Sequence, residues 1–425
     1  EIEKRVREAA RKGPLVLLPS HKSHIDYLIV SVVLSDAGLA PPLIAAGDNL
    51  SFFPLGPILR RGGAFFIKRS FKGKKLYPKL VDAYIRKILV EGWNVEVFLE
   101  GGRSRTGKLL PPKLGILSMI VDACLRLRGH KEVQVVPISI GYERIIEEGS
   151  YTLENEGGEK EPESVGGLLR APRVLRSKYG RLYLQFGEIL PFERLLGETL
   201  ERVTPGRETT QEITPSVRRA LIQRVAHRAM FEINRATLVT PAALTATALL
   251  SFSRKRGVPR SDLLERCRVL CTAFSRLGAQ IARALRDRRG ELRPDAVAEA
   301  LRLFEDARLV STPSEKEDKK RKDPTRTEPI YVVPDERRIA LEYHKNSVLH
   351  FFVPSAIVAA ALGSLGWEAP MPAVRDRVRV LSRLFKLEFM YRADAQFDDV
   401  FADALGVMIE ADEVVWEGDR ARRAG

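Results

Sequence analysis

Between residues 14 and 188 the sequence alternates short runs rich in β-branched and apolar residues with longer amphipathic stretches. This alternation is typical of a sheet covered by helices. Helical patterns fit residues 24–36, 76–92 and 114–128. The strand candidates, in chain order, are PLVLLP, PPLIAAG, GAFFI, NVEVFLE, VQVVPISIG and RLYLQFGE. The sequence therefore predicts an α/β fold for this part of the chain.

Beyond about residue 195 the strand signals fade and long helical patterns take over. Residues 311–329, STPSEKEDKKRKDPTRTEP, have almost no apolar side chains and are typical of an exposed linker or disordered loop. We therefore predict four parts. They are an α/β domain that carries the chemistry (1–200), a helical region (201–310), a charged linker or disordered loop (311–329) and a C-terminal helical region (330–425).

Two uncharged stretches need to be weighed as membrane segments. Residues 347–367 contain His350 and Pro354, and residues 237–253 are interrupted by Pro241. A spanning helix needs about 20 strongly apolar residues, so we predict a buried core helix at each place. The alternative, that one of them lies in the membrane interface beside basic residues, stays open. The charged opening EIEKRVREAARKG has no apolar signal region, and we expect no secretion signal.

The charge balance narrows the possible partners. Lys and Arg number 70 against 55 Asp and Glu, which gives a net charge of +15. Such an excess favours phosphorylated substrates, nucleic acid or an acidic lipid surface, and does not choose among them. The three cysteines, Cys124, Cys267 and Cys271, have no ligand-like neighbours. We therefore predict no disulfide framework, no metal site and a reducing compartment.

The segment PSHKSHIDYLIVS places His21 and Asp26 five positions apart, at the junction between a strand and a helix. Five residues turn an ideal helix through about 500°, so the two side chains cannot share one helical face. His21 must lie in the turn, with Asp26 reaching back from the first helical turns. This geometry suits a carboxylate that holds an imidazole in one tautomer while its other nitrogen abstracts a proton. In the alternative, His21 caps the helix and Asp26 supplies negative charge near its start.

The glycine-rich segment EGGRSRTGKLLPPKLG has the spacing of a phosphate-binding loop between Gly102 and Lys108. Leu109, however, stands where a nucleotide hydrolase needs a Ser or Thr hydroxyl. We therefore interpret the loop as a clamp in which Arg103, Arg105 and Lys108 neutralise a phosphomonoester without a metal ion. A loop that merely docks anionic lipid is the alternative.

Two other segments give weaker signals. In RGGAFFIKRSFKGKK, Arg69 directly follows a short apolar strand and could bind a phosphate through two guanidinium nitrogens. The other charges there predict a solvated face or a contact with phospholipid head groups. In VVPISIGYERIIE the apolar residues predict core, and Pro137 is expected to shape one wall of a cleft.

Taken together, four ordered blocks within about 120 residues resemble the glycerolipid acyltransferase superfamily: HKSHID, GAFFIKR, EGGRSR and the Val-Pro-Ile strand. The residues of these blocks are most similar to those of the glycerol-3-phosphate branch, since lysophosphatidate acyltransferases typically have a shorter NHxSxxD form of the first block. KEPESVGGLLRA and YHKNSVLHFFVP resemble that branch too. The resemblance spans most of the chain and does not include the long N-terminal and C-terminal extensions of the larger members, so we expect part of membrane targeting and regulation to lie in sequence outside these residues. The resemblance implies a mixed sheet flanked by helices, followed by a helical C-terminal region.

The resemblance also implies roles for individual residues. It makes His21 the general base and Asp26 its orienting partner. It assigns binding of the substrate phosphate to Arg69, Arg103 and either Arg105 or Lys108. Ser104 is placed in the same substrate-binding loop. The polyol site is assigned to Glu100 and Gly101, and the acyl-donor side to Pro137.

The function implied is transfer of a fatty acyl group from acyl-CoA or acyl-carrier protein to the sn-1 hydroxyl of glycerol 3-phosphate. Neither a Gly-x-Ser-x-Gly elbow nor a Cys–His nucleophile is present, which favours direct transfer with no cofactor besides the acyl co-substrate. We expect peripheral or monotopic binding to anionic lipid on the cytoplasmic face of the cell membrane, and no nucleic-acid partner. The alternatives are dihydroxyacetone phosphate as the acceptor, or a non-catalytic basic lipid-binding module.

Overall fold

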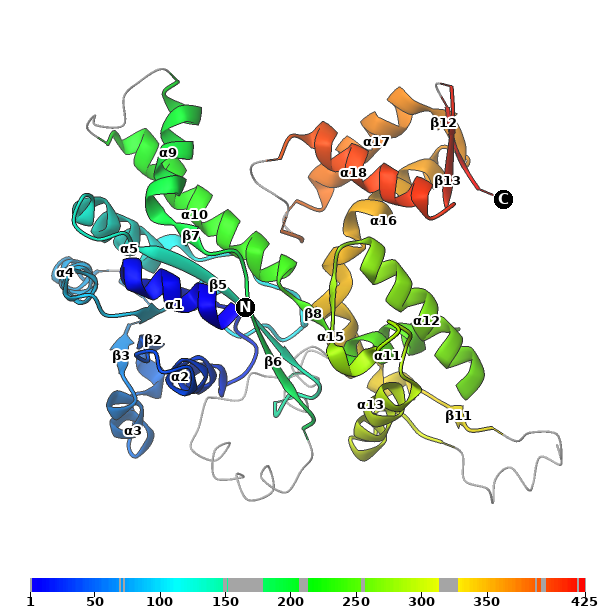
Figure 1. The fold of residues 1–425 in the computed structure, drawn as a ribbon, viewed down its shortest axis with the longest axis horizontal. Coiled ribbons are helices and arrows are strands. Elements are labelled where there is room, and N and C mark those ends of the chain that lie inside the picture. The colour runs from blue at the N-terminus through cyan, green and yellow to red at the C-terminus, as the bar shows by residue number, and fades with distance from the viewer. Residues whose placement is uncertain are drawn as a thin grey trace.

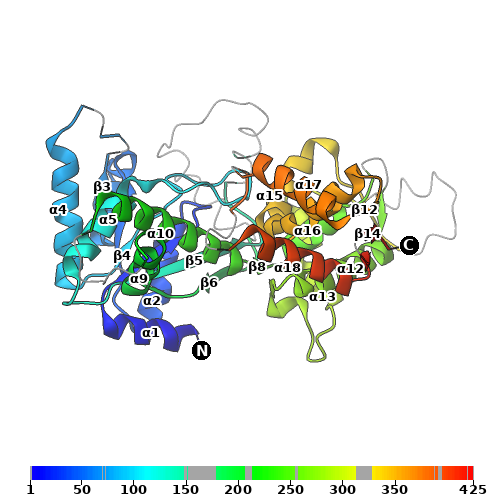
Figure 2. The same ribbon diagram turned by 90° about the horizontal axis from the view of Figure 1, so that it is seen from above.

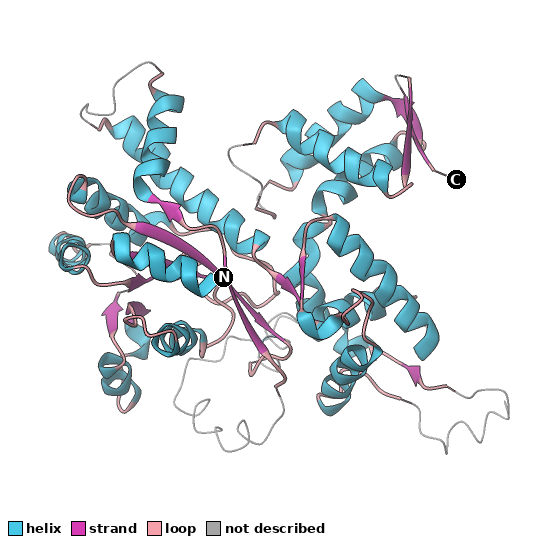
Figure 3. Cartoon of the chain, in the orientation of Figure 1, coloured by secondary structure: helices cyan, strands magenta, loops and turns pink. Residues whose placement is uncertain are grey.

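A computed structural model describes residues 2–68, 70–71, 73–147, 151, 179–205, 213–253, 257–312, 328–386, 388–390, 395–418 and 420–424. The N-terminal part contains the large sheet, and helices dominate the remainder (Figure 3). The described helices of the C-terminal part lie at the opposite end of the molecule from the helix formed by Leu76–Glu91, α4 (Figure 2).

A seven-stranded mixed sheet forms the centre of the N-terminal part (Figure 1), in the order β3-β2-β4-β1-β5-β6, with β7 also paired to β5. The first five strands run parallel, and β6 and β7 run antiparallel to β5. The predicted α/β class and all six strand candidates are confirmed. The strands are β1 (Leu15–Pro19), β2 (Leu43–Gly47), β3 (Ala64–Ile67), β4 (Val95–Glu96), β5 (Gln134–Tyr142), β6 (Leu182–Phe186) and β7 (Leu190–Pro191).

Each face of this sheet has its own core, because successive side chains of a strand point to opposite faces. Val16 and Leu18 of β1 join the cluster under α4, α5, α9 and α10, whereas Leu15 and Leu17 join the cluster under α1 and α2. The predicted helices at 24–36, 76–92 and 114–128 are confirmed. The helices of this part are α1 (Ile2–Lys12), α2 (Asp26–Asp36), α3 (Leu55–Arg61), α4 (Leu76–Glu91), α5 (Leu114–Leu127), α9 (Phe192–Val203) and α10 (Pro215–Arg235).

Two further hydrophobic cores follow along the chain. The second contains the helices α11 (Pro241–Leu250), α12 (Arg260–Arg276), α13 (Pro294–Asp306) and α15 (Arg338–Val348). Two short strand pairs accompany them: β8 (Leu238–Val239) pairs with β10 (Gln280–Ile281), and β9 (Val258–Pro259) pairs with β11 (Ile330–Tyr331). The third is built by α16 (Val353–Ser364), α17 (Met371–Leu384) and α18 (Phe397–Glu410), with the sheet of β12 (Glu368–Pro370), β13 (Val414–Glu417) and β14 (Arg420–Arg423). One-turn 3-10 helices lie at Asp48–Leu50, Arg283–Leu285, Asp335–Arg337 and Leu349–Phe351.

The expected helical C-terminal region is confirmed, with small sheets that the sequence patterns did not predict. Strands of two to four residues are too short to show a clear periodicity, which explains the omission. The predicted domain limits stay predictions. α10, beyond the limit at residue 200, contributes Val217 to Ile233 to the same core as the sheet. Most of the predicted linker, residues 313–327, lies outside the described residues.

The stretch at 237–253 contains the buried helix α11, as predicted, whereas the stretch at 347–367 comprises the end of α15, a 3-10 helix and α16. Nearly every residue of α11 is buried, and α16 buries one face in the third core. In the described parts of the chain, no single helix has both the length and the apolar composition needed to cross a bilayer. Asp335–Phe351 and Val353–Ser364 meet that criterion only together, and they are bent by 83° where they join.

Candidate active site

The turn between β1 and α2 brings His21 and Asp26 together, as their spacing requires. The distance from Nδ1 of His21 to Oδ2 of Asp26 is 3.1 Å, and both side chains are buried. α2 has Ile25 at its N-cap position and no side-chain cap. The alternative, that the His21 side chain caps this helix, is therefore wrong.

The Asp26 carboxylate is held from several sides. Its Oδ2 accepts hydrogen bonds from the backbone N–H groups of Lys22 (2.5 Å) and Ser23 (2.8 Å), and its Oδ1 accepts one from the Tyr142 hydroxyl. Because an ionised carboxylate is only an acceptor, the proton of a neutral His21 lies on Nδ1, and Nε2 keeps its lone pair. Nε2 is 3.2 Å from the Tyr27 hydroxyl, which donates to it in this tautomer.

Glu100 ties the turn to the glycine-rich loop. One of its carboxyl oxygens accepts from the backbone N–H of His21 at 2.7 Å, and the other accepts from the N–H of Leu110 at 2.9 Å. Burial raises the pKa of Glu100 to about 8, although these two hydrogen bonds and nearby Lys22 oppose the rise. The side chain assigned by resemblance to the polyol site therefore holds the His21 backbone in place.

Lys22 is a buried basic residue of the same turn that the sequence patterns did not single out. Its side chain is buried, and burial lowers its pKa, while the carboxylates of Glu100 and Asp26 act in the opposite direction. Tyr27 and Tyr142 were missed as well. Tyr27 directly follows Asp26, and Tyr142 ends β5, the parallel neighbour of β1. No local sequence signal points to Tyr142, because its contact with Asp26 depends on the pairing of β5 with β1.

Arg103 lies beside the same turn. Its Nη1 donates to the Tyr151 hydroxyl at 3.1 Å and is 3.7 Å from a carboxylate oxygen of Glu147. The Tyr151 hydroxyl donates to the backbone oxygen of Lys22, and Glu147 accepts from the Ser23 hydroxyl and the His24 N–H. One arginine of the predicted phosphate clamp is therefore brought to the His21–Asp26 turn.

The remaining residues of the loop have different surroundings. The Ser104 N–H donates to the His21 backbone oxygen at 2.8 Å, and its hydroxyl donates to the Lys108 backbone oxygen, so Ser104 holds the loop against the turn. The Lys108 ammonium binds Glu388 and lies over the Phe389 ring, rather than facing His21. Arg105 belongs to the same loop and is partly buried, and its assignment to phosphate stays a prediction.

Two parts of the prediction lie outside the described residues: Arg69 and the segment KEPESVGGLLRA at 160–171. Pro137 is inside β5, opposite Leu18 of β1, and its backbone oxygen accepts from the Gly187 N–H at 2.8 Å. Its expected place beside the acyl donor stays a prediction.

Comparison with known families identifies the chain. The family described as glycerol-3-phosphate acyltransferase C-terminal region matches residues 151–424, and the family described as acyltransferase matches residues 1–141. The chain belongs to the glycerol-3-phosphate acyltransferase family. It is an acyltransferase for substrates of the glycerophosphate type.

Among solved structures, the chain is similar to the 1-acyl-sn-glycerophosphate acyltransferase PlsC from Thermotoga maritima. The two sequences are 16% identical, and the match covers 55% of this chain and 79% of that one, with a TM-score of 0.27.

Two glycines shape the loop of this acyltransferase. Gly101 and Gly107 have φ of +64° and +86°, in the left-handed region that favours glycine. A Cβ at Gly107 would lie 2.1 Å from the backbone oxygen of Tyr343 in α15. Asn346, also in α15, donates to the Thr106 backbone oxygen at 2.9 Å. The loop that borders the catalytic turn therefore rests directly on the C-terminal half of the chain.

We expect Gly107→Ala to lower the free energy of unfolding by roughly 1–3 kcal/mol, because the new methyl group meets backbone and the residue keeps a positive φ. Chemical denaturation of the full chain measures this difference. Gly102→Ala is the matched control, since Gly102 has no positive φ and no atom within 4 Å of an added Cβ. Equal stability of the two variants would contradict the close packing of Gly107 on α15.

Proposed function

We propose that this acyltransferase moves a fatty acyl group from acyl-CoA or acyl-carrier protein to the sn-1 hydroxyl of glycerol 3-phosphate. The product would be 1-acyl-glycerol 3-phosphate, in the first step of phospholipid synthesis. The observation that carries the proposal is the 3.1 Å contact between Nδ1 of His21 and Asp26, which leaves Nε2 as the base. The family match and the cationic surroundings of this pair support the choice of a phosphorylated acceptor.

In this mechanism the acceptor hydroxyl takes the place of the Tyr27 hydroxyl at Nε2 of His21. Nε2 removes the hydroxyl proton while the oxygen attacks the thioester carbonyl, and a tetrahedral oxyanion forms. Collapse of this intermediate breaks the C–S bond, and the imidazolium returns the proton to the departing sulfur. A thioester is reactive enough for direct attack, so the proposal includes no acyl-enzyme and no cofactor.

Asp26 contributes by keeping the His21 ring in one tautomer and by stabilising the imidazolium that forms during attack. Because the carboxylate is fixed by backbone N–H groups and by Tyr142, the ring does not have to reorient during the reaction. General-base catalysis of this kind contributes about a hundred- to ten-thousand-fold to rate, and positioning of the two substrates contributes much of the rest.

The acceptor phosphate would bind on the side of the turn where Lys22 and Arg103 lie. Arginine suits this role because its planar guanidinium offers several donors to phosphate oxygens, and Arg103 uses Nη1 to contact Tyr151. The resemblance adds Arg69 to the same group. These cations would hold the substrate so that its sn-1 hydroxyl reaches Nε2 of His21.

We expect His21→Ala to lower kcat by at least about a hundredfold, because the general base is lost. The assay incubates purified protein with glycerol 3-phosphate and labelled palmitoyl-CoA and measures labelled lysophosphatidate. His130→Ala, at an exposed histidine after α5, is the control and should keep full activity. Near-normal turnover of His21→Ala would refute the proposed base. Parallel reactions with dihydroxyacetone phosphate show which acceptor is preferred.

Arg103→Ala and Arg69→Ala should mainly raise KM for glycerol 3-phosphate, by about 10- to 100-fold, since each loses a charge-assisted hydrogen bond to phosphate. Steady-state kinetics at saturating palmitoyl-CoA measure the change. Arg126→Ala, at an exposed position of α5, removes the same charge away from the site and should leave KM unchanged. A normal KM in both clamp variants would remove the support for a phosphate clamp.

We also propose that the edge of the sheet around β3 binds an anionic phospholipid membrane, on the cytoplasmic face of the cell membrane. α3 and α4 flank this edge (Figure 1) and expose large apolar side chains. Leu76 is 81% and Leu80 66% exposed on α4, and Ile58 is 60% exposed on α3. The cations nearby in sequence are Arg60, Arg61, Lys68, Lys74, Lys75 and Lys79. Exposed apolar groups beside cations are typical of peripheral binding to acidic lipid.

The double variant Leu76→Asp and Leu80→Asp should lose most of its binding to vesicles of phosphatidylcholine and phosphatidylglycerol in a flotation assay. The two carboxylates replace apolar groups that would enter the lipid and are repelled by its negative charge. Val269→Asp, at a 53% exposed position of α12, is the control and should float like the unmodified protein. Unchanged flotation of the double variant would contradict the proposed membrane face.

A further inference from the structure

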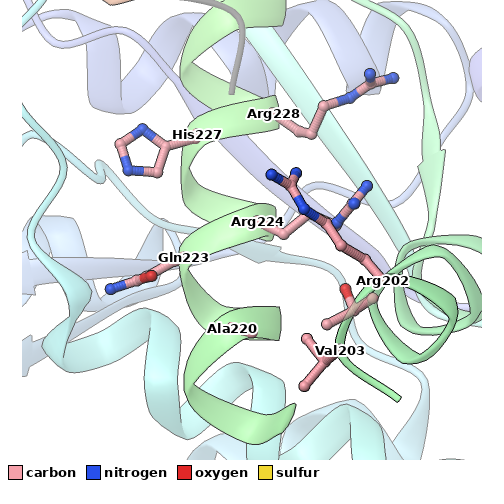
Figure 4. A pocket seen from close by; sticks show the side chains of 8 residues that line it. Arg202, Val203, Ala220, Gln223, Arg224, His227 and Arg228 are labelled. Carbon is pink, nitrogen blue, oxygen red and sulfur yellow. The ribbon is translucent and has the colours of Figure 1, made fainter. Parts of the chain in front are cut away.

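A cavity of about 380 Å³ lies between α9 and α10, apart from the catalytic turn. Figure 4 shows its lining, in which four of the eight residues, three arginines and His227, carry or can carry positive charge. The Thr199 hydroxyl, also in the lining, donates to the Leu195 backbone oxygen within α9. The lining residues are Thr199, Arg202, Val203, Ala220, Gln223, Arg224, His227 and Arg228.

Arg202 of α9 and Arg224 of α10 line the same cavity from the two helices (Figure 4). Arg228 follows Arg224 one helical turn later on α10 and lines the same cavity. Like charges that line one partly enclosed space repel, and an anion bound among them reduces that repulsion. The planar guanidinium matches phosphate oxygens through paired hydrogen bonds, so the arrangement fits a phosphate group.

Among the described residues, the carboxylates near this cavity are shared with arginines outside it. Glu198 accepts a hydrogen bond from Arg224 at 2.7 Å and is also 3.9 Å from Arg194. Glu188 is 3.9 Å from Arg228 and is shared with Arg194 and Arg235. Among the described residues, no carboxylate lies within ion-pair distance of Arg202. Arg202 is therefore the arginine of this cavity for which the described residues offer no ion pair.

α10 also relates this cavity to the catalytic turn. Near its C-terminal end is Asn234, whose backbone oxygen is 2.9 Å from Nε2 of His350. The charge of Lys22 contributes to lowering the pKa of His350, below the larger effect of burial. Arg228 precedes Asn234 by six residues and Arg224 by ten, which places them roughly 9 and 15 Å back along the helix axis. The cavity is thus set back along α10 from the end of that helix which contacts His350.

We propose that this cavity is a second anion site, which binds a phosphate group of a phosphorylated ligand through Arg202, Arg224 and Arg228. Gln223 supplies an uncharged donor beside them. The phosphate belongs either to a soluble phosphate ester such as coenzyme A or to a phospholipid head group. Both sources present the same chemistry to the three arginines.

The test titrates the full chain with inorganic pyrophosphate by isothermal calorimetry, in the presence of saturating glycerol 3-phosphate to occupy the acceptor site. Arg202→Glu should weaken pyrophosphate binding at least tenfold, because it reverses a charge in the cavity. Arg202→Gln, a milder variant, should weaken it less. Arg219→Glu is the control, since it makes the same charge change at an exposed position of α10 outside the cavity and should bind like the unmodified protein.

Pyrophosphate binding that is undetectable in the unmodified protein, or equally tight in Arg202→Glu, would overturn the proposal. Competition then identifies the source of the phosphate. Displacement by coenzyme A indicates the soluble ester, and displacement by phosphatidylcholine vesicles containing phosphatidic acid indicates the head group. Displacement by neither would overturn the assignment to a phosphate ester. The acyl-transfer assay of His21→Ala is independent, so failure of this site and failure of the proposed function are distinguishable.

Discussion

The arrangement of the catalytic turn depends on one buried carboxylate, that of Asp26. A charged group without contact with water is stable inside a protein only when its hydrogen-bonding capacity is filled. Asp26 meets this condition through the N–H groups of Lys22 and Ser23, the Nδ1 of His21 and the hydroxyl of Tyr142. These donors come from the turn, the histidine ring and the neighbouring strand. The same contacts that stabilise the charge therefore fix the geometry of the base.

The glycine-rich loop holds the catalytic turn in place, and the C-terminal half of the chain holds the loop. Glu100 and Ser104 bind the backbone of His21 from the loop side. Gly107 packs so closely on Tyr343 that no larger residue fits between the two segments without a shift of backbone. The acyltransferase match at residues 1–141 and the C-terminal match at 151–424 thus meet at the candidate active site.

Much of this could be predicted from short-range patterns. The six strands follow from β-rich runs, and the meeting of His21 with Asp26 follows from a spacing that excludes a shared helical face. Contacts between distant segments could not be predicted in the same way. Tyr142 reaches Asp26 only because β5 lies beside β1, and Lys108 binds Glu388, 280 positions away. A local motif shows which residues carry charge, but the fold decides which partner each charge meets.

The place of α10 has a practical consequence for anyone who divides this protein into smaller pieces. A fragment cut after residue 200 would keep every strand of the large sheet, yet it would lose Val217, Leu221 and Val225, which cover one face of that sheet. The uncovered apolar surface would favour aggregation. A minimal N-terminal fragment therefore has to extend through Arg235, the last residue of α10, before its solubility reports on the catalytic turn.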